Sequence, residues 1–267
     1  MSRVRGHTQA GRPALSSEAT RDRILGIASP LLLILAWEAA ARMGLIDTRF
    51  FPAPSAIFVS MISLAQSGDL LDNTWASLSR LMWGILVGGV PGVVIGIVMG
   101  LNRQFRAALD PLIAATFPIP KSALMPLALL ILGIGEASKI FMVAVGVFYP
   151  VAINTTAGVL GISKVYMDVG RNFKASRWQL FTTIALPGAL PIIMTGIKLG
   201  VGMGLVLIAV AEMVGAKNGL GYMVWSAWET FAVEQMYVSL FVIAMIGFLS
   251  TVILNEIERI LVPWKAR

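Results

Sequence analysis

Long runs of apolar residues, separated by short polar segments, dominate the sequence. A helix that crosses the hydrocarbon core of a bilayer needs about 20 mainly apolar residues. The stretches that meet this requirement are Ile24–Leu45, Leu81–Leu101, Leu112–Ile134, Ile140–Gly161, Ala189–Val214 and Tyr237–Ile257. Backbone groups cannot stay unpaired in lipid, and the alternation typical of a barrel strand is absent. The pattern therefore predicts an all-α membrane protein, a polytopic bundle of about six transmembrane helices.

The polar segments between these runs carry an uneven distribution of Lys and Arg. If the N-terminus is cytoplasmic, fourteen basic residues fall in inner segments and five in outer segments. The five outer residues are Arg42, Arg49, Arg80, Lys139 and Lys217. Because positive residues accumulate on the cytoplasmic side, both termini are predicted to be cytoplasmic. The net charge of +7 is thus interpreted as a topology signal, and not as a sign of nucleic-acid binding.

The same pattern divides the chain into regions. These are a basic cytoplasmic tail at 1–23, the first transmembrane helix with an outer loop at 24–69, a transmembrane core at 70–257 with a cytoplasmic loop at 162–187, and a cytoplasmic tail at 258–267. The first tail is expected to be disordered. Within the outer loop, Ile57–Leu71 is expected to form an interfacial helix. The first apolar run contains Trp37 and Glu38 and follows a long polar tail, which favours an uncleaved helix over a signal peptide.

Composition limits the chemistry of the chain. Residues are 57% hydrophobic and 13% charged, whereas soluble domains are about a quarter charged. There is no cysteine, and the single histidine, His7, lies in a polar tail. Disulfides and thiolate metal sites are therefore excluded, and a histidine metal site or a serine–histidine triad is disfavoured. We predict no metal site.

Two of the apolar runs contain glycines at intervals of four residues, namely Gly84, Gly88, Gly92, Gly96 and Gly100 in one and Gly196, Gly200 and Gly204 in the other. Residues four apart lie on one face of a helix, and small residues there let helices pack closely in lipid. Tight packing is the favoured interpretation, and sliding or rocking of these helices past one another is the alternative. A Gly-x-Gly pattern inside an apolar helix does not indicate a nucleotide site, and no phosphate-binding loop occurs, so any ATP must bind another chain.

Prolines interrupt the third apolar run at Pro118, Pro120 and Pro126. Each lacks an amide donor, so this span is predicted to be kinked or partly broken. Irregular backbone at membrane depth occurs only where it is buried in protein or lines a wet cavity. Phe117–Pro126 is therefore a candidate segment of a translocation pathway, and a kink that only shapes the bundle is the alternative.

Ionisable residues inside the apolar runs are few and scattered: Glu38, Lys121, Lys198 and Glu212. Counted along straight helices, both lysines lie roughly 14 Å deep, near the middle of the bilayer. Such charges usually face protein or water, so Lys121, Lys198 and Glu212 are candidate pathway residues. At least one of the two lysines is expected to line the pathway and to ease the passage of an anion. The alternative is structural, with the lysines bonded to carbonyls freed by the prolines or snorkelling along their stems. The scatter argues against an intramembrane enzyme.

The cytoplasmic loop at Val165–Pro187 is basic and too apolar for a linker. Ser176 and Gln179 form a capping box that predicts the start of a short helix. Upstream, Val169 and Phe173 are four residues apart, so a first short helix can present one apolar edge. Two small helices of this kind suit the docking of a soluble partner. The alternative is an interfacial segment anchored in the bilayer by its aromatic residues.

This loop resembles the motif of permeases from bacterial ABC importers: Glu-Ala-Ala, three residues, Gly, nine residues, then Ile-x-Leu-Pro. Asp168-Val169-Gly170 takes the place of Glu-Ala-Ala, Lys174 that of Gly, and Ile184-Ala185-Leu186-Pro187 the end. A lysine at the glycine position is a departure, so either Lys174 tolerates the bend or the bend shifts toward Gly170. The resemblance assigns ATPase coupling to Asp168, Val169, Gly170, Phe173, Lys174, Ser176, Trp178, Ile184, Leu186 and Pro187.

Further motifs resemble the nitrate, sulfonate, taurine and bicarbonate branch of that family. They are Pro120-Lys121 with Pro126-Leu127, Gly133-Ile134-Gly135 with Ser138-Lys139, Ala211-Glu212-Met213, Gly219-Leu220-Gly221, and Glu258-Arg259 with Pro263-Trp264. The resemblance implies a type I importer permease of the bacterial inner membrane that carries no cofactor and is not an enzyme.

The resemblance also implies partners. These are cytoplasmic ATPase subunits that bind ATP and Mg, an external solute-binding protein, a second copy of the permease, and membrane lipids. The implied solute is a small anion such as a sulfonate, taurine, nitrate or bicarbonate. A pyrimidine precursor or another aromatic heterocycle is the alternative solute, and an intramembrane enzyme on a helical scaffold is a remote alternative.

Overall fold

The computed structural model describes residues 14–264, and within this range every regular element is a helix. The chain divides into two compact units, with the boundary between Val59 and Ser60. Helix α1 (Ala14–Arg42) belongs to the first unit, and helix α2 (Pro54–Ser67) spans the boundary. Five helices are individually long and apolar enough to cross a membrane, and a bent pair raises the number to six. The predicted all-α multi-pass architecture is confirmed.

In the first unit, α1 begins ten residues before the predicted start of the first apolar run. The disorder expected at 14–23 is therefore wrong, because this stretch continues the helix, and residues 1–13 lie outside the described range. Near the other end of α1, Glu38 accepts hydrogen bonds from the side chain of Arg42 and from the backbone N–H and hydroxyl of Ser55, at 3.0 and 2.8 Å. This carboxylate thus joins α1 to the start of α2.

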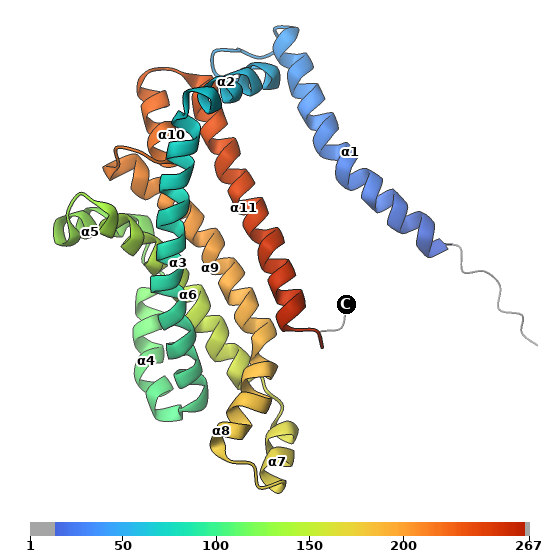
Figure 1. Ribbon diagram of the computed structural model, residues 1–267, viewed down its shortest axis with the longest axis vertical. Coiled ribbons are helices and arrows are strands. Elements are labelled where there is room, and N and C mark those ends of the chain that lie inside the picture. The colour runs from blue at the N-terminus through green and yellow to red at the C-terminus, as the bar shows by residue number, and fades with distance from the viewer. Residues whose placement is uncertain (1–13, 265–267) are drawn as a thin grey trace, which may run out of the picture. The chain divides into compact units, whose positions relative to one another are not determined.

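The centre of the second unit consists of three long helices that pack side by side: α3 (Asp69–Leu101), α6 (Glu136–Leu160) and α9 (Leu186–Gly215) (Figure 1). Their facing side chains form a buried cluster that includes Leu81, Val143 and Ile208. Helix α3 starts twelve residues earlier than the predicted span at Leu81. The additional turns contain both polar and apolar residues, so hydropathy alone does not assign them to the membrane.

Glycines at four-residue intervals bring these helices together. A Cβ atom at Gly88 would lie 2.2 Å from the carbonyl oxygen of Ala144, and one at Gly96 would lie 2.5 Å from the Cβ of Thr155. On α9, a Cβ at Gly196 would lie 2.7 Å from the Cβ of Asn154. The other glycines of the two series, Gly84, Gly92, Gly100, Gly200 and Gly204, also face residues of α6. Helix α6 is therefore held closely on two sides by glycine faces.

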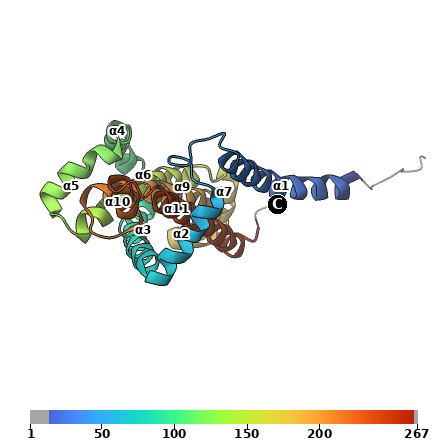
Figure 2. The same ribbon diagram turned by 90° about the horizontal axis from the view of Figure 1, so that it is seen from above.

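The third apolar run is not one helix. Helix α4 (Arg103–Thr116) is followed by a 3₁₀ turn at Lys121–Leu124 and by α5 (Met125–Leu132), and the two segments are bent by 90°. Pro118 and Pro120 lie in the break, where neither can donate a backbone hydrogen bond. The predicted break is confirmed, whereas the single span Leu112–Ile134 is not found. Figures 1 and 2 both show α5 displaced to the side of the α3–α6–α9 core.

Four further helices complete the second unit: α7 (Lys164–Asn172), α8 (Arg177–Leu180), α10 (Leu220–Glu229) and α11 (Val233–Leu261). A π-helical turn at Phe181–Ala185 joins α8 directly to α9. In Figure 1, α7 and α8 lie at one end of the α3–α6–α9 core and α10 lies at the opposite end. The unit therefore presents two distinct ends, each with its own set of polar and aromatic side chains.

Candidate functional site

The connection between α7 and α8 is a tight bend centred on Lys174. This residue has a left-handed backbone, with φ of 55°. The N–H of Ala175 donates to the carbonyl of Gly170 at 3.1 Å, and the N–H of Lys174 donates to that of Arg171 at 2.8 Å. This pair of bonds is a Schellman motif, in which glycine is the usual residue at the left-handed position. Lys174 therefore adopts the conformation expected of the family glycine, and the bend has not moved to Gly170.

Local hydrogen bonds and packing fix both helices of this connection. The backbone N–H of Ser176 donates to Gln179 Oε1 at 2.8 Å, and the N–H of Gln179 donates to Ser176 Oγ at 3.2 Å, which confirms the predicted capping box. Gly170 is buried, and a Cβ there would lie 2.5 Å from Leu180 and 2.8 Å from Ile184. The α7 helix can approach the π-helical turn this closely only because residue 170 is glycine.

Apolar side chains on α7 and α8 face away from the protein. We call Val165, Tyr166, Val169, Phe173 and Trp178 the α7–α8 surface; all five side chains are exposed. Phe173, at the end of α7, is 84% exposed. The remaining predicted coupling residues lie around this surface: Asp168 pairs with Arg171 at 3.3 Å, and Ile184, Leu186 and Pro187 are half-buried at the junction with α9. An apolar surface of this kind at one end of a bundle is typical of an interaction site.

Lys121 occupies the break between α4 and α5. Its ammonium group donates to the carbonyl oxygens of Thr116, Phe117 and Ile119 at 3.1, 2.5 and 3.0 Å. It also lies 4.4 Å from the centre of the Tyr149 ring. The depth of roughly 14 Å assumed a straight helix and does not apply, because α4 ends before Lys121. The observed contacts match the structural alternative, in which the lysine satisfies carbonyls freed by the prolines.

Lys198 lies on α9 and faces α11. Its ammonium group forms an ion pair with Glu258 and donates a hydrogen bond to Asn255 Oδ1 at 2.5 Å. The charge of Lys198 is therefore balanced within the chain. Glu212, the third ionisable candidate, lies fourteen residues further along α9 than Lys198 and belongs to a separate polar cluster with Ser77 and Arg80.

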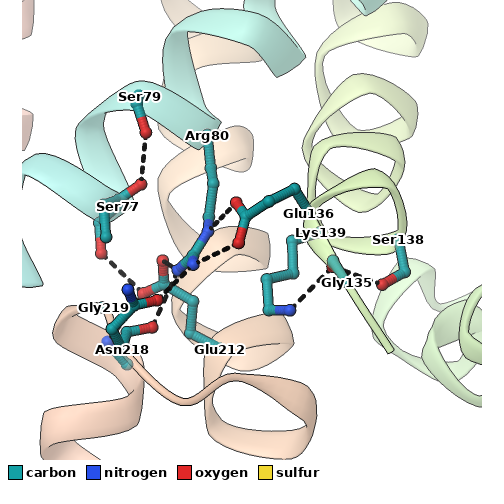
Figure 3. Close-up of polar contacts among 12 residues, drawn as sticks. Ser77, Ser79, Arg80, Gly135, Glu136, Ser138, Lys139, Glu212, Asn218 and Gly219 are labelled. Atoms are coloured by element: carbon teal, nitrogen blue, oxygen red, sulfur yellow. Dashed lines mark hydrogen bonds and ion pairs between the residues drawn. The ribbon is translucent and has the colours of Figure 1, made fainter. Parts of the chain in front are cut away.

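The polar cluster around Glu212 was not predicted. Arg80 donates from Nε and Nη2 to the two oxygens of Glu136 at 2.6 and 2.7 Å, and from Nη1 to Glu212 at 2.7 Å (Figure 3). It also donates to the backbone and side-chain oxygens of Asn218 at 2.9 and 2.5 Å. We call Arg80, Glu136, Lys139 and Glu212 the charge cluster. It joins α3, α6 and α9 at the end that bears α10.

The positions of two cationic residues in this cluster differ from the sequence prediction. Arg80 and Lys139 were placed in outer polar segments, but both lie within helices and are buried. The signal that could have located Arg80 is the glycine series itself, because Arg80 is four residues before Gly84 and so continues the same face toward α6. Arg80, Glu136 and Glu212 are 56 and 132 residues apart in sequence, so their meeting depends on tertiary packing.

The backbone around Glu212 is shaped to enclose its carboxylate. Ser77 donates to it at 2.7 Å, and the N–H of Gly221 donates at 3.0 Å. Gly219 has a left-handed backbone, with φ of 117°, and a Cβ there would lie 2.4 Å from the carboxylate carbon. A Cβ at Gly221 would lie 2.2 Å from the carbonyl oxygen of Ala209. The Gly-Leu-Gly motif thus permits the close approach of α10 to α9.

The charge cluster is suited to holding helices together, because Arg80 donates to residues of α6 and α9 and to Asn218. Within residues 14–264, there is no group of three or more acidic, His or Cys side chains that could hold a metal ion. Arginine presents a planar fork of donors that matches oxyanions, whereas metal ions require several converging acceptors.

Comparison with known proteins relates this architecture to transport. Residues 92–267 match the family model described as the binding-protein-dependent transport system inner membrane component. The chain is 36% identical to the taurine transport system permease protein TauC of Escherichia coli (strain K12), over 92% of this chain and 91% of that protein. It is 30% identical to the putative aliphatic sulfonates transport permease protein SsuC of Bacillus subtilis (strain 168), over 95% of each.

A third relative and a solved structure extend the comparison. The nitrate import permease protein NrtB of Synechocystis is 32% identical over 71% of this chain and 69% of its own length. The MetNI methionine ABC transporter, in an inward-facing conformation, has a chain that superposes with a TM-score of 0.64 at 20% identity, covering 74% of this chain and 98% of that one. The superposition on the MetNI chain shows that the helical arrangement is that of a type I importer permease.

The family model and the relatives together define the family of this protein. The chain belongs to the family of binding-protein-dependent transport system inner membrane components, and it is a multi-pass inner-membrane permease subunit, not an enzyme.

Proposed function

We propose that this permease forms the translocation pathway of an ATP-driven importer for a small oxyanion: taurine, an aliphatic sulfonate or nitrate. The observation that carries the proposal is the similarity, over most of the chain, to permeases named for these solutes. Each of the solutes presents a singly charged group with several equivalent oxygens. An external binding protein delivers the solute, and a second copy of this permease completes the pathway.

The α7–α8 surface is the proposed docking site of a cytoplasmic ATPase, which binds ATP and Mg. Its exposed side chains are aromatic and aliphatic, and aromatic anchors in a well-packed contact supply much of the binding energy of protein interfaces. The Schellman bend and the capping box hold both short helices in one arrangement, so little conformational freedom is lost when a partner binds.

Replacement of Phe173 with Asp tests the docking site. Loss of a buried aromatic anchor costs about 2 kcal/mol or more, which corresponds to roughly thirtyfold weaker binding of the ATPase. Phe231→Asp is the matched control, because Phe231 is 82% exposed and lies after α10, at the other end of the second unit. The measurement is the yield of ATPase that co-purifies with the tagged permease. Equal yields from the two variants would show that the docking assignment is wrong.

ATP-dependent uptake tests the solute. The permease, its ATPase and the cognate binding protein are reconstituted in liposomes, and import of taurine, ethanesulfonate and nitrate is compared with import of methionine. We expect import of at least one oxyanion and none of methionine. If the complex assembles and hydrolyses ATP but imports none of the three oxyanions, the proposed solute class is incorrect.

A further inference from the structure

The two carboxylates bound to Arg80 differ sharply in exposure. The side chain of Arg80 is 3% exposed and that of Glu212 is fully buried, whereas the side chain of Glu136 is 61% exposed. Glu136 nevertheless makes the bidentate contact, through Nε and Nη2 of the guanidinium. The Nε–Nη2 edge of the buried arginine is thus covered by a carboxylate whose own side chain is largely exposed at the protein surface.

The buried carboxylate also has more hydrogen-bond partners than the exposed one. Glu212 is fixed by Ser77, by the N–H of Gly221 and by Arg80. The Glu136 carboxylate has Arg80 as its hydrogen-bonding partner, and this residue is the first of α6, directly after the connection that contains Gly133 and Gly135. A rotation of its side chain would free Nε and one donor of Nη2 of Arg80, while the contacts of Arg80 with Glu212 and Asn218 stay in place.

Charge balance shows what such a rotation would leave behind. The cluster contains two cations, Arg80 and Lys139, and two carboxylates, Glu136 and Glu212. Lys139 is buried and donates to the carbonyl of Gly135 at 2.8 Å (Figure 3). With the Glu136 carboxylate turned away, two cations face one carboxylate, and the site has a single uncompensated positive charge. The N-terminus of α6 adds a partial positive charge at the same place.

We propose that Arg80 is an anion-binding residue, and that the Glu136 carboxylate is a tethered substitute that the oxyanion group of the solute displaces. A sulfonate or nitrate group presents two oxygens to Nε and Nη2 in the manner of a carboxylate, and its single charge equals the one that the rotation uncovers. The identity of the anion rests on the proposed function, whereas the competition between anion and Glu136 rests on the geometry of the cluster.

Binding of ethanesulfonate to the full-length permease tests this inference. The protein is placed in phosphatidylcholine nanodiscs, which carry no anionic lipid, and titrated by calorimetry. Glu136→Gln and Glu136→Ala remove the competing charge, and we expect each to lower the Kd by about tenfold, because the solute no longer displaces a charge-assisted pair. Asp72→Asn is the matched control: it removes an exposed carboxylate from the same end of α3, and it should leave the Kd unchanged.

Two further measurements separate a site from a general charge effect. The neutral analogue ethanesulfonamide should bind no more tightly to the Glu136 variants than to the wild type. Arg80→Lys combined with Glu136→Ala keeps the charge but removes the two-pronged donor, and should abolish the gain in affinity. Elution as a single species of unchanged size would show that this double variant is folded.

These measurements distinguish a failure of the anion-site inference from a failure of the proposed function. If the wild type imports an oxyanion while both Glu136 variants bind ethanesulfonate as the wild type does, Glu136 is only a structural latch and the inference is overturned. An equal gain in Asp72→Asn would also overturn it, because the effect would then be one of overall charge. If the Glu136 variants gain affinity but no oxyanion is imported, the anion site is retained and the proposed solute class is lost.

Discussion

Replacement of Gly88 with Ala is expected to separate α3 from α6. The added Cβ would lie 2.2 Å from the carbonyl oxygen of Ala144 and 2.7 Å from its Cα, and both of these are backbone atoms. A flexible side chain could rotate away, but backbone cannot. The neighbouring Gly89 provides the matched control, since a Cβ there meets its nearest atom, on Val147, at an ordinary 3.6 Å.

Both substitutions gain from the higher helix propensity of Ala, and only Gly88→Ala also creates a steric clash. Ala favours a helix over Gly by about 1 kcal/mol at either position. Overpacking of a close contact costs about 1–3 kcal/mol. The cost at Gly88 is expected at or beyond the upper end of this range, because the clashing atoms belong to the backbone of Ala144. We therefore expect Gly89→Ala to be neutral or slightly stabilising and Gly88→Ala to be destabilising by about 2 kcal/mol or more overall. For a chain of this size, a loss of about 2 kcal/mol lowers the Tm by about 4–8 °C.

Thermal unfolding in detergent, followed by tryptophan fluorescence and by circular dichroism, measures both variants against the wild type. The chain contains seven tryptophans, so no label is needed. If Gly88→Ala unfolds at the same temperature as Gly89→Ala, the two helices adjust without cost. The close approach would then contribute nothing to stability.

Other perturbations follow from single contacts. Lys174→Gly should stabilise the α7–α8 bend by about 0.5–1 kcal/mol, seen as slower amide exchange at Ala175, because glycine has no left-handed penalty; faster exchange would contradict this. Lys121→Met should cost about 1.5–3 kcal/mol of stability by leaving three carbonyls without a charged donor; selective loss of uptake, with assembly and basal ATPase activity retained, would instead support the pathway hypothesis. Lys198→Met should destabilise more than Lys198→Met combined with Glu258→Gln, since the single change removes the ammonium partner of a carboxylate that keeps its charge; additive Tm losses would refute the pairing.

Most of the fold could be predicted because the lipid environment imposes it. A membrane helix must be long and apolar, so hydropathy located five of the helices, and the prolines at 118 and 120 located the break in the sixth span. Local rules also sufficed for the capping box at Ser176. The start of α3 at Asp69 could not be found in this way, because its first turns mix polar with apolar residues and bury only Leu70 and Ser77 before Arg80.

The candidate site was predicted only in part. The α7–α8 surface is local in sequence, and its periodicity and motif spacing were sufficient to identify it. The charge cluster is not local: Arg80 and Glu212 meet because α3 and α9 both pack on α6, and nothing in either segment specifies the partner. Glu212 was singled out as an ionisable residue inside an apolar run and as part of a family motif, whereas Glu136 has no feature in the sequence that distinguishes it from a solvated residue.

The junction of α8, the π-helical turn and α9 has a mechanical consequence. Helical structure is continuous from Trp178 to Gly215, a run of 38 residues. At about 1.5 Å per residue, Trp178 and Glu212 are roughly 50 Å apart when measured along this helical run. A tilt of about 5° about the Trp178 end would move the Glu212 end by roughly 4 Å, which is more than a hydrogen bond tolerates. If the run moves as one body, a small rotation at its α8 end is therefore enough to break the contacts of Glu212 at the other end.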